Sequence, residues 1–159
     1  MVYGAIDKKS ETGYTYLKKI FRAMNGKQKE YNWLITNQDC YPKDMEMWRF
    51  FNNRDYLWIS GEELSEIIEQ DDFQWVWGML CGFDQSVSLE QALQHGLPQE
   101  ADYEHYFEKP LRMQFPFSQT EIVPFDSTYV LFLSRHKEQV ESFRKNYPNS
   151  TNLAEYCGR

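Results

Sequence analysis

Short runs of apolar and aromatic residues alternate along the chain with longer stretches in which apolar residues recur every three or four positions. The short runs predict strands, because β-branched and aromatic side chains fit a half-buried pleated surface. They lie at residues 2–6, 31–36, 56–59, 74–83, 111–115 and 129–133, with a shorter one at 121–123. Within 74–83, period-two placement predicts that Trp75 and Trp77 share one face of their strand.

The longer stretches predict helices, since apolar residues three and four positions apart share one side of a helix. Helices are expected over about 11–25, after residue 60 and over about 136–147. Ser10 is placed to cap the first of them. Ser60 and Glu63 have the spacing of a capping box, and Ser88 and Gln91 repeat it ahead of a short helix.

Three segments lack either period. Residues 37–44 have the composition of a loop, and 97–110 reads as an exposed acidic connection that contains Tyr103, Tyr106 and Phe107. Residues 45–51 are aromatic and ambiguous, so they receive no assignment.

The order of these elements predicts the fold class. Strands and helices interleave at uneven spacings, which favours an α+β protein over a regular alternation of parallel strands and helices. We expect a single globular domain over 1–159, with a mixed, mostly antiparallel sheet and helices packed mainly on one face. Neither G-x-G-x-x-G nor a Walker loop occurs, which argues against a doubly wound nucleotide-binding fold.

Charge is distributed unevenly along the chain. Between Arg54 and Lys109 there are thirteen carboxylates and no lysine or arginine. The first thirty residues carry a balance of +4, which leaves −11 on the rest of a chain whose net charge is −7. Such an acidic stretch is solvated, neutralised by the basic N-terminal segment, or used to hold a basic partner.

Composition and motifs exclude several classes of function. A pI near 5.0 disfavours nucleic-acid binding. Spaced carboxylates could instead imitate the phosphates of nucleic acid and bind a DNA-binding enzyme, although a net charge of −7 is modest for that role. The apolar runs are too short to span a membrane, and the N-terminus lacks a signal-peptide pattern, so a cytoplasmic protein is expected. The three cysteines, Cys40, Cys81 and Cys157, are too widely spaced for a zinc site, and we predict no metal and no cofactor.

The acidic stretch and its aromatic residues predict a protein-binding or inhibitory module of the immunity, antitoxin or regulatory type. Carboxylates attract a cationic partner while tyrosine and tryptophan supply compact contact area. A basic protein is therefore the expected partner, and the sequence assigns neither catalytic residues nor an oligomeric state. The candidate partner-binding residues are Glu62, Glu66, Glu69, Asp71, Asp72, Tyr103, Glu104 and Tyr106.

Two alternative functions use other residues. A small enzyme could use carboxylates and histidine, with Asp102, His105 and the pair Asp126 and Ser127 as its constellation. A small-ligand-binding protein could instead line a groove with tryptophans, although aromatic residues on strands are more often core. The tryptophans are Trp33, Trp48, Trp58, Trp75 and Trp77.

Two short segments carry a resemblance to known proteins. The segment Tyr31-Asn32-Trp33-Leu34-Ile35, after an opening strand and helix, is one of them. The other is Asp126-Ser127-Thr128-Tyr129-Val130, which leads into a strand and the last helix. Together they resemble a small family of Bacillus-type bacterial proteins without an assigned activity. The resemblance covers the ends of the chain and implies a bacterial cytoplasmic protein without catalytic residues.

Overall fold

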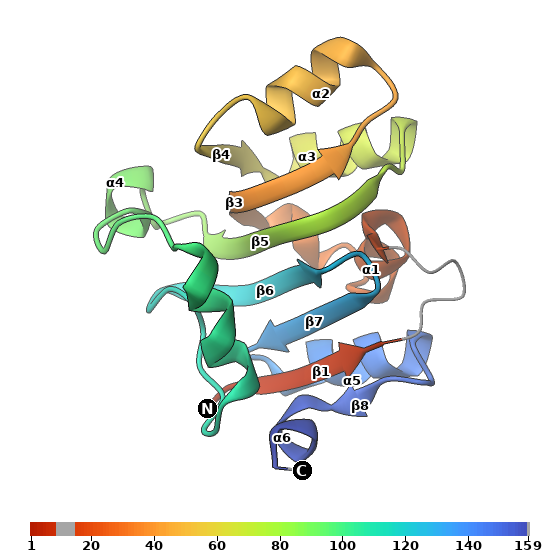
Figure 1. Cartoon of the computed structure of the whole chain (residues 1–159), viewed down its shortest axis with the longest axis vertical. Coiled ribbons are helices and arrows are strands. Elements are labelled where there is room, and N and C mark those ends of the chain that lie inside the picture. The colour runs from red at the N-terminus through yellow and green to blue at the C-terminus, as the bar shows by residue number, and fades with distance from the viewer. Residues whose placement is uncertain (9–14, 159) are drawn as a thin grey trace.

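An antiparallel sheet of eight strands forms the centre of the computed structural model, which describes residues 1–8 and 15–158 (Figure 1). The strand order is β4-β3-β5-β6-β7-β1-β8, and the short β2 pairs with β5. The strands are β1 (Tyr3–Asp7), β2 (Thr15–Tyr16), β3 (Tyr31–Tyr41), β4 (Tyr56–Ser60), β5 (Gln74–Asp84), β6 (Ser118–Phe125), β7 (Tyr129–Ser134) and β8 (Thr151–Asn152). The prediction of an α+β domain with a mostly antiparallel sheet is confirmed.

The three helices α1, α3 and α5 lie on one face of the sheet, behind it in Figure 1. The 3-10 helix η2 and the short helix α6 cover part of the other face. The helices are α1 (Leu17–Ala23), η1 (Lys27–Glu30), α2 (Met45–Asn52), α3 (Gly61–Gln70), α4 (Leu89–Ala92), η2 (Glu100–Phe107), α5 (Lys137–Asn146) and α6 (Leu153–Cys157). None of the helices in the described parts of the chain has the length and hydrophobicity needed to cross a bilayer.

The rear core lies between the sheet and helices α1, α3 and α5. It is rich in aromatic rings, including fully buried Trp33 and Trp75, and Phe132 stacks on Phe143 of α5 at 4.8 Å. Gly82 makes room for these rings, because a Cβ there would lie 3.0 Å from the ring of Tyr31. Glycine in this strand is therefore a packing requirement of the rear core.

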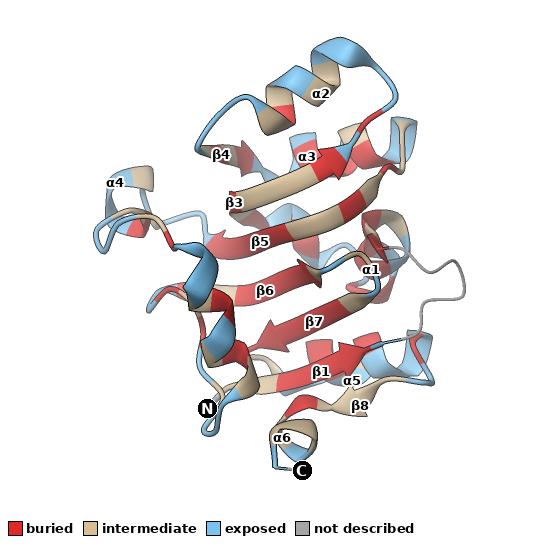
Figure 2. Ribbon diagram, viewed as in Figure 1, coloured by how far each residue is buried: buried red, intermediate tan, exposed pale blue. Residues whose placement is uncertain are grey.

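The front core lies between the sheet and a cover made of η2, α6 and residues 111–117. Tyr103 and Tyr106 of η2 belong to it, with side chains only 5% and 1% exposed. The prediction that 97–110 is an exposed connection is therefore wrong for these two tyrosines. Figure 2 shows that one side of η2 is buried against the sheet while the other is exposed.

Residues 111–115 were predicted to form a strand, and this prediction is wrong. Met113 and Phe115 are buried at alternate positions, so the apolar alternation is real, but the segment packs over the sheet and does not join it. The buried carboxylate of Glu121 accepts from the backbone amides of Gln114 (2.8 Å) and Phe115 (3.4 Å). These amides are therefore satisfied by a side chain and not by a neighbouring strand.

The helix predicted over 11–25 begins later than expected. Thr15 and Tyr16 pair with β5, and α1 starts at Leu17, while Ser10 lies outside the described residues. No side chain at the N-cap position bonds to this helix, but the carboxylate of Asp72 accepts from the Lys18 amide at 3.1 Å. A residue far along the chain thus satisfies one of the free amides at the start of α1.

Two irregularities lie between β3 and β5. The strand β3 continues through residues 37–41, which were predicted to be a loop, but its pairing with β5 stops at Thr36 and resumes at Asp39 in a shifted register. A second shift places Asp39 opposite Trp77 and Cys40 opposite Trp75, so Val76 is an extra residue on β5. Such a bulge reverses the alternation of side chains, and the prediction that Trp75 and Trp77 share a face is wrong.

Several local predictions are confirmed. The Ser60 hydroxyl accepts from the Glu63 amide at 3.1 Å, which is one of the two hydrogen bonds of the predicted capping box, and both bonds are present between Ser88 and Gln91. The helix predicted over 136–147 is α5 and ends just before Pro148, as the sequence indicated, although it is not the last helix, because α6 follows it. The unassigned segment 45–51 forms most of α2, which begins after Asp44 as its N-cap.

Candidate functional site

A groove with an aromatic lining opens on the front of the sheet, where η2 meets β5 and β6. Its volume is about 620 Å³. It is lined by Trp77, Gln99, Glu100, Ala101, Tyr103, Glu104, Phe107 and Phe125. We refer to these eight residues as the acidic aromatic groove.

The aromatic rings of the groove form one continuous cluster. Trp77 lies 4.8 Å from Phe125 and 5.2 Å from Tyr103, between ring centroids. Phe107 contacts Phe125 edge to face, at 5.3 Å between ring centroids. Because Tyr103 is buried while Trp77, Phe107 and Phe125 are only half-buried, the last three present ring surface to solvent.

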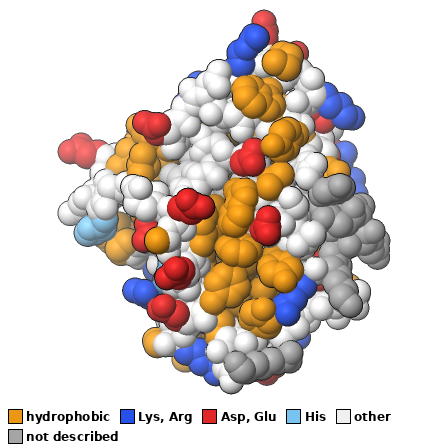
Figure 3. Space-filling model, in the orientation of Figure 1, with side chains coloured by type: hydrophobic (Ala, Val, Ile, Leu, Met, Phe, Trp, Pro, Cys, Tyr) orange, Lys and Arg blue, Asp and Glu red, His pale blue; other side chains and the backbone are white. Residues whose placement is uncertain are grey.

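The aromatic surface continues beyond the groove toward α6. Phe107 lies 6.4 Å from Tyr156, and the Nζ of Lys8 sits over the ring of Tyr156 at 4.2 Å from its centroid. Figure 3 shows hydrophobic side chains gathered in a stripe on this face, with acidic side chains beside it. A cation of the chain itself thus already occupies the end of this surface.

The charge of the groove is negative. Glu100 and Glu104 are exposed, and none of the eight lining residues is lysine, arginine or histidine. Burial raises the pKa of the Tyr103 hydroxyl, so this group is neutral at physiological pH. The two glutamates therefore supply the charge, above rings whose faces are themselves electron-rich.

Helix η2 is stabilised by a cap at its start and by a hydrogen bond to the sheet. The Asp102 carboxylate accepts from the Gln99 amide, in a capping box at the start of the helix. The Tyr106 hydroxyl donates to the buried Glu121 carboxylate at 2.8 Å. These contacts fix the helix that carries Glu100 and Glu104, so the rim of the groove is positioned by the core.

The acidic residues predicted on α3 lie on the other side of the sheet. Glu62, Glu66 and Glu69 are exposed and face α1 and η1 across a second groove of about 550 Å³. That groove also contains lysine and arginine side chains, and Lys18 pairs with Glu69 at 3.4 Å. The basic N-terminal segment therefore packs beside the acidic helix and partly neutralises it.

Asp71 and Asp72 have structural contacts. The Asp71 carboxylate accepts from the Lys43 amide at 2.9 Å, and Asp72 accepts from the Lys18 amide. Each aspartate thus ties the segment between α3 and β5 to another part of the chain. Burial raises the pKa of Asp72, although the Lys18 amide and the charges of Lys18 and Arg22 lower it.

The predicted partner-binding residues therefore do not form one surface. Of the eight, Tyr103 and Glu104 belong to the groove, while Tyr106, also on η2, is buried in the front core. Sequence reasoning did not join Trp77, Phe125 and Glu100 in one site, although Trp77 was among the tryptophans considered for a ligand groove. The acidic and aromatic composition of 97–110 was the available sequence signal for Glu100. No sequence signal indicates the bulge that brings Trp77 to this face.

The residues considered for an enzyme make local contacts. The His105 ring bonds through Nδ1 to the Asp102 carbonyl oxygen, while Asp126 and Ser127 lie in the turn between β6 and β7 with φ of 50° and 67°. In the described structure no hydrogen bond or ion pair joins His105 to Asp126 or Ser127. A catalytic role would require these groups to act on one another or on a common atom.

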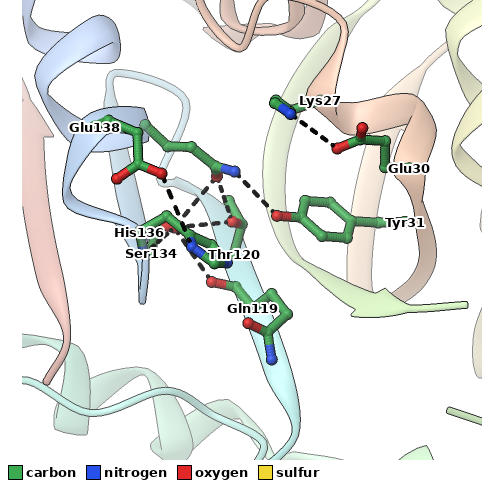
Figure 4. Close-up of polar contacts among 9 residues, drawn as sticks. Lys27, Glu30, Tyr31, Gln119, Thr120, Ser134, His136 and Glu138 are labelled. Carbon is green, nitrogen blue, oxygen red and sulfur yellow. Dashed lines mark hydrogen bonds and ion pairs between the residues drawn. The ribbon is translucent and has the colours of Figure 1, made fainter. Parts of the chain in front are cut away.

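A polar network at the other end of the sheet is shown in Figure 4. The side-chain oxygen of Gln139, on α5, accepts from the hydroxyls of Thr120 (2.6 Å) and Ser134 (3.2 Å). The Gln139 amide donates to the Tyr31 hydroxyl at 3.0 Å. This buried network joins α5 to β3, β6 and β7.

The same network does not pair a nucleophile with a base. The backbone amide of His136 donates to the Ser134 hydroxyl at 3.0 Å, while the His136 ring lies 4.0 Å from the Glu138 carboxylate. The imidazole thus faces an exposed glutamate and not the buried hydroxyl, so we assign the network to packing of α5.

No group of three or more histidine, cysteine, aspartate or glutamate side chains is arranged to hold a metal ion within residues 1–8 and 15–158.

Comparisons with protein-family models, curated proteins and solved structures find no match for this chain. The resemblance of the chain ends to a Bacillus-type family stays a prediction.

Proposed function

We propose that this protein is a binding module that holds a basic protein partner through the acidic aromatic groove. The observation that carries the proposal is the combination in one groove of half-buried aromatic rings and exposed glutamates without a basic residue. An inhibitory or regulatory role follows if the bound surface is the partner's own functional site.

The chemistry of the groove suits this role. Trp77 and the phenylalanines beside it are rigid and lose little side-chain entropy when a partner covers them, which is typical of residues that dominate interfaces. Glu100 and Glu104 attract positive charge over a longer range and orient the approaching surface. The aromatic contacts thus contribute affinity, and the carboxylates contribute selection of a cationic partner.

Capture experiments with variants test the proposal. The tagged protein is used to capture partners from its native cell lysate at low and moderate salt. We expect a basic protein to be retained at low salt, weakened by salt, and lost from the variants Trp77→Ala and Glu100→Lys/Glu104→Lys.

The double variant Glu62→Lys/Glu66→Lys is the matched control, because it makes the same charge change on α3, behind the sheet. Its retention of the partner is the expected result. If the control loses the partner as completely as the groove variants, or if the groove variants keep it, the groove is not the binding surface. Far-ultraviolet circular dichroism of each variant establishes that it is folded.

A further inference from the structure

We infer that the acidic aromatic groove is a subsite for an arginine side chain of the partner. This inference rests on the proposed function and names the group that enters the groove. It is argued from the ring surfaces, from the two carboxylates on η2 and from the lysine that already covers the end of the aromatic stripe.

The ring surfaces suit a flat cation. Trp77 and Phe125 meet edge to face, so the cluster presents ring faces in more than one direction. A guanidinium group stacks on such faces through both cation–π attraction and flat contact. It is also more weakly hydrated than an ammonium group, so less hydration is lost when it enters an aromatic site.

The carboxylates suit a group with several donors. Glu100 and Glu104 stand four residues apart on a 3-10 helix, a rise of about 8 Å along its axis. Both line the groove, and both are exposed residues with long side chains. Arginine carries five N–H donors on a planar group and can bond two carboxylates at once, whereas lysine presents a single point charge.

The end of the aromatic stripe shows the same preference for cations. The Nζ of Lys8 lies over Tyr156, which is joined to Phe107 of the groove by ring contact. In the described part of the chain, no lysine or arginine lies over the ring of Trp77 or Phe125. These half-buried rings therefore lie in the groove together with both glutamates.

Short peptides test the inference directly. The probes are a capped glycine-rich pentapeptide with arginine at its centre, and the same peptide with lysine or with citrulline, which keeps the shape of arginine without its charge. Binding is followed by the amide and indole signals of the ¹⁵N-labelled protein, with the Trp77 indole assigned from the variant Trp77→Phe.

We expect the arginine peptide to shift the Trp77 indole signal and the amides of η2. Replacement by citrulline should weaken binding about tenfold, as should the variant Glu100→Gln/Glu104→Gln, and lysine should fall between. The variant Glu62→Gln/Glu66→Gln should bind like the parent. Equal shifts with arginine and citrulline, or shifts that do not involve Trp77, would overturn the inference.

The two proposals fail in different ways. If a basic partner is captured through Trp77 but the arginine peptide does not bind, the subsite is wrong while the binding module stands. If the arginine peptide binds in the groove but no captured partner depends on Glu100 and Glu104, the subsite stands and the protein-binding role fails.

Discussion

Trp75 and Trp77 are two residues apart on the same strand, yet they face opposite sides of the sheet. Trp75 is fully buried against Phe51 and Phe73 in the rear core, and Trp77 is half-buried in the groove at the front. The bulge at Val76 separates them, and the Val76 carbonyl accepts from the Ser127 amide at 2.9 Å. One extra residue in β5 therefore supplies the groove with its tryptophan.

Substitution of the two tryptophans should have different consequences. Trp75→Ala removes a fully buried ring and should lower the free energy of unfolding by about 3–5 kcal/mol. Trp77→Ala should cost about 1–2 kcal/mol, because its ring is only half-buried, but it should abolish partner binding. Urea unfolding followed by circular dichroism measures both changes, and equal costs would contradict the assignment of Trp77 to an open groove.

Glu121 should be essential for stability although it lies outside the groove. Its carboxylate is fully buried and accepts from Tyr106, the Gln114 amide and the Ser118 hydroxyl. Glu121→Gln replaces one acceptor oxygen with an NH₂ group that faces donors, and should lower the free energy of unfolding by about 2–4 kcal/mol.

The control for Glu121 is Glu141→Gln on α5, an exposed residue 3.8 Å from Lys137. Its expected effect is below about 0.5 kcal/mol, since exposed ion pairs contribute little. Chemical denaturation of the two variants side by side checks the contrast. A Glu121→Gln protein as stable as the parent would mean that its carboxylate does not hold residues 111–118 in place.

Asp72 should make stability depend on pH. Burial raises its pKa in the folded protein, so the folded state binds more protons than the unfolded state between the ordinary pKa and the raised one. The free energy of unfolding contributed by this group is therefore largest below the ordinary pKa and falls as pH rises through the raised pKa. Burial also raises the pKa of Asp7, so this group adds to the fall in the free energy of unfolding as pH rises.

Two substitutions separate the charge of Asp72 from its hydrogen bond to Lys18. Asp72→Asn keeps an oxygen acceptor for the Lys18 amide and removes the charge, so part of the fall in stability with pH should disappear. Asp72→Ala removes the acceptor as well, so it should be about 1 kcal/mol less stable than Asp72→Asn at any pH. Thermal unfolding from pH 3 to pH 7 measures both, and an unchanged pH profile for Asp72→Asn would refute the assignment.

Gly82 should tolerate no side chain. A Cβ at this position would lie 3.0 Å from the ring of Tyr31 and 3.2 Å from that of Trp33, so Gly82→Ala should cost about 1–3 kcal/mol. Gly78→Ala on the same strand is the matched control, because its Cβ would lie farther from its neighbours, 3.3 Å from the end of Leu80 and 3.4 Å from the ring of Trp75. A smaller loss for Gly78→Ala, measured by denaturant unfolding, is the expected result.

Helix caps and strands could be predicted where the signal is local. Ser88 and Gln91 form the predicted capping box because both partners lie within one turn. The strand β7 was predicted because its apolar run is uninterrupted and is buried on both faces. By contrast, the alternation at 111–115 correctly indicated which residues are buried, but the segment is not a strand. The backbone amides of Gln114 and Phe115 donate to the Glu121 carboxylate and not to a neighbouring strand.

The candidate site was predicted in part. The acidic and aromatic composition of 97–110 indicated a binding surface, and Glu104 with Tyr103 lies in the groove. The acids of α3 were grouped with them because both belong to one acidic stretch of sequence. In the folded chain the sheet separates the two, and Lys18 pairs with the α3 side.

The sequence by itself determined the class of fold, the caps at Ser60 and Ser88 and the excess of carboxylates, because these depend on composition and on residues within a few positions of one another. Only the tertiary structure decided which acids share a surface, since that depends on which face of the sheet each helix covers. It also decided that Trp77 reaches the groove, because the bulge at Val76 is set by pairing between β3 and β5, residues far apart in the chain.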